Sequence, residues 1–157
     1  MIHKQKYFNL ALPLYILLFL TLSPHSISAA TLKLVSTKTT PNFQLSLEID
    51  KVEKLAGLKI SLTYPNKILQ FKSATKTKAT SAFMHVVNDK HPGKLIIVMA
   101  SAKGISGSDM ALFDLSFDLA APSGKAKSTT IKTTSCQLMT EDLKELPCNA
   151  SPYEIKF

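Results

Sequence analysis

Residues 43–50 read Phe-Gln-Leu-Ser-Leu-Glu-Ile-Asp, so apolar and polar side chains alternate along the whole stretch. Successive side chains of a β-strand point to opposite faces, and this period of two therefore puts one face in a core. Residues 58–64, 113–119 and 153–157 repeat the pattern. Residues 95–100 form a continuous apolar run, which is typical of a strand covered on both faces or of one in the centre of a sandwich. Together these stretches predict an all-β fold.

Weaker strand signals and turn residues fill the intervals between these stretches. Further strands are expected at residues 32–35, 69–74, 83–87 and 129–133, with turns at residues 64–66, 88–93, 104–109 and 122–124. Only residues 108–112 and 141–146 could form one turn of helix, because no segment carries a sustained apolar stripe of helical period. About nine short, closely spaced strands predict an antiparallel β-sandwich.

The first thirty residues have the features of a secretory signal peptide. Two lysines precede a mostly apolar stretch at residues 7–22, and small residues surround Ser28 and Ala30. We therefore expect cleavage after Ser28 or Ala30, with a signal peptide at 1–30 and one domain at 31–157. The alternative is an uncleaved membrane anchor, but the stretch is slightly short for a bilayer core and contains an asparagine and a proline. The expected location is secreted, periplasmic or on a bacterial cell surface.

The positive charge of the chain could attract phosphates or an anionic surface, but the type and the distribution of its basic residues argue against nucleic-acid binding. The 157 residues include 19 basic and 11 acidic side chains, for a net charge of +8, and every basic residue is lysine. The forked guanidinium of arginine, which makes bidentate contacts to bases and phosphates, is missing here. Because the lysines are also scattered along the chain, they predict a solvated surface rather than a nucleic-acid site.

Four segments in register resemble the cohesin family. Residues 58–71 resemble the cohesin segment in which a strand ends in Tyr-Asp-Pro, and residues 92–107 resemble the stretch that ends in Ala-Ser-Ala-Glu-Gly-Leu-Ser-Gly. Residues 112–117 match the strand that follows, and Leu146-Pro147 falls where cohesins often carry Ile-Pro. The resemblance covers nearly all of residues 32–157. It implies a nine-stranded jelly-roll sandwich that binds another protein, as cohesins of cellulosomes hold the dockerin modules of polysaccharide-degrading enzymes.

The resemblance also implies a contact surface. Alignment on Tyr64 places Gly57 and Lys59 where familiar cohesins carry Asn and Asp toward the dockerin, and Lys103 replaces a Glu. A lysine ammonium only donates hydrogen bonds, so this surface should favour an acidic or acceptor-rich partner over a standard dockerin. The implied contact residues are Gly57, Lys59, Lys103, Gly104, Ser106 and Gly107. The alternative is that these lysines only solvate a sheet face.

Cys136 and Cys148 are the only cysteines of the chain. Export would place them in an oxidising compartment, where thiols form disulfides. The resemblance puts them at the end of one strand and near the start of the last strand, beside a common turn. We therefore predict a Cys136–Cys148 disulfide, and two free thiols are the alternative.

No set of residues predicts catalysis, a cofactor or a metal site. His85 and His91 have only Asp89 nearby in the sequence, which is a poor match to a metal centre or a general base. Asp114 and Asp118 share the outward face of one strand, where a solvated edge is the simpler interpretation than an acid/base pair. The sequence therefore predicts a binding module and not an enzyme.

A carbohydrate-binding module is the second interpretation. Such modules usually stack sugars on exposed aromatic rings, but this chain has no Trp. The phenylalanines at core positions of the strand pattern are Phe43, Phe71, Phe113 and Phe117, which leaves Tyr64, Tyr153 and Phe83 for a ligand. The main prediction is thus an exported protein-binding module linked to polysaccharide degradation, and glycan binding is the alternative.

Overall fold

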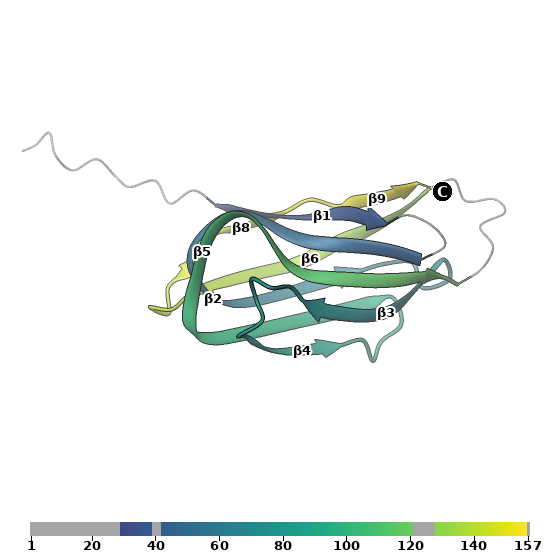
Figure 1. Cartoon of the computed structure of the whole chain (residues 1–157). Helices are drawn as coiled ribbons and strands as arrows, with labels where there is room; N and C mark the ends of the chain where they lie inside the picture. The colour runs from purple at the N-terminus through teal and green to yellow at the C-terminus, as the bar shows by residue number, and fades with distance from the viewer. Residues whose placement is uncertain (1–28, 39–41, 121–127, 157) are drawn as a thin grey trace, which may run out of the picture.

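The computed structural model describes residues 29–38, 42–120 and 128–156, and the predicted signal peptide lies outside these residues except for its last two positions. All regular structure in these ranges is β-strand (Figure 1). The strands are β1 (Ala30–Lys38), β2 (Asn42–Thr63), β3 (Leu69–Lys76), β4 (Met84–Asn88), β5 (Lys94–Leu119), β6 (Ser128–Thr140), β7 (Glu145–Leu146), β8 (Cys148–Ala150) and β9 (Tyr153–Lys156). The predicted all-β jelly-roll sandwich is confirmed. The described part of the chain contains no helix that could cross a membrane.

Two long strands bend and contribute to both layers of the sandwich. The first half of β2 pairs with β1 and with the second half of β5, whereas its second half pairs with β6 and the first half of β5. Figure 1 shows β5 curving from one layer to the other. Four of the separate strands that the sequence suggested are therefore the halves of two continuous strands, β2 and β5.

Three local expectations differ from the structure. Residues 104–109 were expected to form a turn, but β5 continues through them because β2 stays paired alongside, with Val52 opposite Gly107 and Leu55 opposite Ile105. The single helical turn that residues 108–112 or 141–146 could form is absent as well: the first range is strand, and the second is a tight turn leading into β7.

The sheet is mixed rather than wholly antiparallel, since β1 pairs with β8 in parallel. In this pairing Ala30 lies opposite Cys148 and Leu32 opposite Ala150. The backbone N–H of Ala30 also donates to the carbonyl of Pro147 at 2.9 Å. The last segments of the chain thus hold its first described strand in place.

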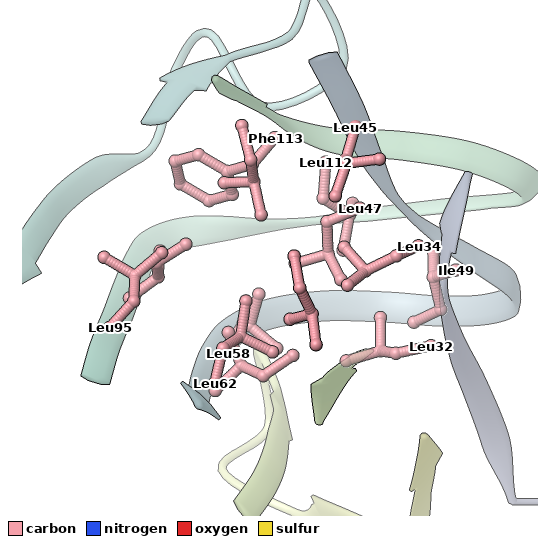
Figure 2. Packing of buried hydrophobic residues seen from close by; sticks show 14 of the residues in the cluster. Leu32, Leu34, Leu45, Leu47, Ile49, Leu58, Leu62, Leu95, Leu112 and Phe113 are labelled. Atoms are coloured by element: carbon pink, nitrogen blue, oxygen red, sulfur yellow. The ribbon is translucent and has the colours of Figure 1, made fainter. Parts of the chain in front are cut away.

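The core lies between the two layers and is built by the predicted alternation. Leu45 and Leu47 of the first half of β2 point toward Leu58 and Leu62 of its second half and toward Leu95 of β5 (Figure 2). All five side chains are essentially buried. Burial of this kind stabilises the fold by about 1.5–3 kcal/mol for each large aliphatic side chain. The positions of the apolar residues therefore decide which face of each strand turns toward the core.

Candidate protein-binding face

Four strand segments form one open face of the sandwich, in the order β4, first half of β5, second half of β2, β6. The register aligns their outward side chains in rows across the sheet. One row runs from Val86 through Val98 and Lys59 to Gln137. The next row runs from Met84 through Ala100 and Gly57 to Met139. We call this surface, defined by these two rows, the docking face.

The docking face carries exposed apolar side chains. Within the described ranges, five large hydrophobic side chains are exposed, and four of them lie in the two rows. Their exposed fractions are 79% for Met84, 66% for Val86, 38% for Val98 and 37% for Met139. A cluster of this kind on a sheet face, rather than single scattered residues, is typical of a protein interaction site.

Gly57 leaves a shallow pocket in the middle of the docking face. A Cβ at this position would stand 3.2 Å from the Cβ of Met139, closer than side chains normally pack. The pocket beside it has a volume of about 260 Å³ and is lined by Lys59, Val98, Gln137, Met139 and Glu145 as well as Gly57. The absence of a side chain at residue 57 thus opens a recess that an apolar group of a partner can enter.

Lys59 and Lys103 differ in their relation to this face. Lys59 is exposed in the centre of the face, between Val98 on one side and Gln137 on the other. Lys103 is exposed farther along β5, where the strand approaches its bend. The structure therefore brings Gly57 and Lys59 together on the docking face and places Lys103 toward its end.

The remaining predicted contact residues lie in the bend and make contacts within the chain. Ser106 Oγ accepts a hydrogen bond from the backbone N–H of Lys54 at 2.8 Å, and the N–H of Gly104 donates to Glu141 Oε2 at 2.9 Å. Gly107 lies against Met110, whose sulfur would be 2.7 Å from a Cβ at residue 107. These three positions shape the bend, and their contact with a partner stays a prediction.

An ion-pair cluster of Lys54, Glu141 and Asp142 closes the bend. The Nζ atom of Lys54 lies 3.4 Å from Glu141 Oε1 and 3.5 Å from Asp142 Oδ2. The hydrogen bond to Glu141 and the charge of Asp142 raise the pKa of Lys54 above its ordinary value. Lys54 has a positive φ of 55°, a conformation that is uncommon for residues other than glycine.

A disulfide joins Cys136 of β6 to Cys148 of β8, with Cα atoms 5.9 Å apart. It links the docking face to the opposite layer, because β6 borders β2 on that face and β8 pairs with β1. The predicted pairing is present in the structure.

The residues considered for catalysis occupy ordinary positions. The ring of His85 packs near Phe113, with centroids 5.7 Å apart. Asp118 pairs with Lys72 at 3.1 Å. The sequence predicted that Asp114 and Asp118 lie on a solvated edge. They do not, because β5 has β2 on one side and β3 on the other. In the described ranges, no three His, Cys, Asp or Glu residues cluster as metal ligands would.

Two aromatic residues differ in burial from what the strand pattern predicts. Phe83 is only 2% exposed and packs in the core, so it is not available to a ligand. Phe71, which the strand pattern assigned to the core, is half-buried instead, and it lies on β3, which pairs only with β5 at the end of the strand order. Tyr64 and Tyr153 are half-buried, as a ligand-contacting ring would be.

Sequence reasoning missed the apolar side chains of the docking face. Residues 95–100 predict a strand covered on both faces or one in the centre of a sandwich. The strand does lie between β4 and β2, but only Leu95, Ile97 and Met99 are buried, so one of its faces is open. The outward residues of the same run, Val98 among them, are the exposed part of the face. The unbroken apolar run was therefore the available signal for an interaction surface.

Comparison with known proteins finds a likeness in structure alone. No protein-family model matches the chain, and no curated protein matches it. Among solved structures, the chain is similar to a non-cellulosomal cohesin from the archaeon Archaeoglobus fulgidus, with a TM-score of 0.70 and 17% identity over 82% of this chain and 91% of that one.

Two further structures show the same likeness. A cohesin module from a family 33 glycoside hydrolase of Clostridium perfringens has a TM-score of 0.69 and 14% identity, over 82% of this chain and 96% of that one. A type I cohesin–dockerin complex from Clostridium thermocellum has a TM-score of 0.67 and 14% identity, over 81% of this chain and 94% of the matched chain. The protein therefore has a cohesin-like fold.

Proposed function

We propose that the protein is an exported, non-catalytic module that attaches another extracytoplasmic protein through the docking face. The observation that carries this proposal is the gathering of Met84, Val86, Val98 and Met139 around the recess at Gly57. Exposed apolar side chains of this number are costly to leave in water, and a partner that covers them gains stability from their burial.

The structural neighbours support a protein partner. One of them is solved as a cohesin–dockerin complex, and another is a module of a glycoside hydrolase. A dockerin-type module of a secreted polysaccharide-degrading enzyme is therefore the partner class that we propose.

The chemistry of the face sets the partner's surface. An apolar side chain of the partner would enter the recess, and a carboxylate or carbonyl would meet the exposed ammonium of Lys59, which only donates. A partner with lysine or arginine at that point would meet like charge, and such juxtaposition disfavours binding. We propose that Lys103 extends this preference for acidic or acceptor-rich partners.

Calorimetry on purified proteins tests the proposal. The exported chain is first used to capture partners from the secreted and envelope fractions, and each captured protein is then purified and titrated against the wild type. We expect Gly57→Leu, which fills the recess, and Lys59→Glu combined with Lys103→Glu to weaken binding by about tenfold or more.

Lys51→Glu provides the control, because Lys51 is exposed opposite Ser108 of β5, outside the two rows of the docking face, and undergoes the same kind of substitution. It should bind as the wild type does. Binding that survives both docking-face variants, or that falls equally with Lys51→Glu, would contradict the proposed face. Thermal denaturation of every variant confirms that the fold is retained.

A further inference from the structure

A second pocket lies at the end of the sandwich away from the bend. Its volume is about 460 Å³, within the range of small-molecule sites in proteins. The residues that matter for a ligand are Tyr64, Asn66, Gln70, Phe71, Asp89 and Pro92. We call it the end pocket.

The end pocket has two half-buried aromatic rings. Tyr64 and Phe71 both contact the fully buried ring of Phe117, with centroids 5.2 and 5.6 Å away and interplanar angles of 73° and 69°. A single core residue thus holds both rings in position. Burial raises the pKa of the Tyr64 hydroxyl above its ordinary value.

The polar side chains of the end pocket are exposed and of mixed hydrogen-bonding type. Asn66 and Gln70 each carry an amide that both donates and accepts, whereas the carboxylate of Asp89 only accepts. Asp89 is the one charged side chain among the residues that line the pocket. An anionic ligand would therefore meet a like charge, and an ammonium, which only donates, would leave the amide donors unused.

Backbone contacts fix the walls of the end pocket. The N–H of Tyr64 donates to the carbonyl of Gly93 at 2.9 Å, and the N–H of Ala120 donates to the carbonyl of Ile68 at 2.8 Å. Gly93 has a φ of 81°, and a Cβ there would stand 2.8 Å from the carbonyl oxygen of Tyr64. This close approach holds the turn that carries Asp89 against the segment that carries Asn66. A preformed pocket loses less conformational entropy on binding.

We propose that the end pocket binds a neutral sugar unit of a glycan. The apolar face of a sugar ring packs on Tyr64 and Phe71, and its hydroxyl groups, which both donate and accept, pair with Asn66, Gln70 and Asp89. This site is separate from the docking face, so one module can hold a protein partner and contact a polysaccharide at the same time.

An NMR titration of the isotope-labelled exported chain tests this inference, with cellohexaose, xylohexaose and mannohexaose as neutral probes. Trigalacturonate serves as the anionic probe and free lysine as the cationic probe. We expect saturable shifts of amide signals in the end pocket with at least one neutral probe, at a Kd on the order of 1 mM or below. Asp89→Ala and Gln70→Ala, both at exposed positions, should each weaken this binding by about tenfold.

The control is Lys59→Glu, which alters the docking face and should leave sugar binding unchanged. The inference is overturned if no neutral probe saturates, if the shifts fall outside the end pocket, or if neither Asp89→Ala nor Gln70→Ala weakens binding. Tighter binding of trigalacturonate or lysine than of every neutral sugar would also overturn it. None of these results bears on the docking face, because that proposal is tested with protein partners.

Discussion

Lys54 and Glu141 are joined both by their side chains and by their backbones. The Nζ atom of Lys54 lies 3.4 Å from Glu141 Oε1, and the backbone N–H of Glu141 donates to the carbonyl of Lys54 at 2.9 Å. The residues are far apart in sequence, yet this contact fastens the bend of β2 to the turn that follows β6. The Glu141 carboxylate also accepts a hydrogen bond from the N–H of Gly104 in β5, so it contacts both long strands.

The bend predicts a strong requirement for glycine at residue 104. A Cβ there would stand 2.6 Å from the carbonyl carbon and 2.8 Å from the Cα of Lys54, and backbone atoms cannot easily move aside. We expect Gly104→Ala to lower the free energy of unfolding by about 2 kcal/mol in urea denaturation. Gly107→Ala is the matched control. Its Cβ meets the flexible end of Met110, so its cost should stay below about 1 kcal/mol, and equal losses would contradict this account.

Asp50 predicts a loss of stability in acid. The backbone N–H of Thr31 donates to its carboxylate at 2.8 Å and, together with the N–H of Lys51, holds the pKa of Asp50 below its ordinary value. Because the pKa is depressed in the folded state, the stabilisation is present above about pH 4 and is lost as the pH falls through the folded pKa. Asp50→Asn should therefore be less stable than the wild type at pH 7 in thermal denaturation, and this deficit should shrink as the pH falls below about 4. The exposed Asp114→Asn is the control, and a deficit for Asp50→Asn that stays constant as the pH is lowered would refute the assignment.

The disulfide predicts a measurable contribution to stability. Cys136 and Cys148 are twelve residues apart, and closing such a loop stabilises a fold by about 3 kcal/mol on the chain-entropy model. We expect the Cys136→Ser and Cys148→Ser double variant to lose about this much. Hydrogen exchange should then rise first in β8 and β1, which pair with each other. Alkylation of two thiols in the native exported protein would show instead that the bridge is absent.

The contacts of Ala30 in β1 favour one of the two expected cleavage positions. Ala30 is 6% exposed, pairs with Cys148 and donates its N–H to Pro147. Cleavage after Ser28 would keep these contacts, whereas cleavage after Ala30 would remove them. We therefore predict that the exported protein begins at Ala29, and intact-mass measurement of the secreted form tests this. A mature chain that begins at Thr31 would contradict it.

The candidate sites were only partly predictable from the sequence. Gly57 and Lys59 were found through the resemblance to cohesins, and both lie on the docking face. Met84 and Val86 were not found, because a period of two shows that a strand has two faces but not whether another layer covers the second one. The end pocket was not found either, since Tyr64, Gln70 and Asp89 meet only through long-range packing.

The sequence by itself determined the all-β class, which residues of each main strand face the core, and the two cysteines that form the bridge. These features depend on side chains that recur at short, regular intervals or are few in number, so they can be identified without knowing how the strands pair. The tertiary structure alone decided that β2 and β5 continue through the bend. Glycine and serine at residues 104–107 permit a turn, but the pairing of Leu55 with Ile105 and of Val52 with Gly107 keeps the strand extended there. Whether such a segment turns or continues depends on the hydrogen-bonding partners beside it, and these come from residues far away in the chain.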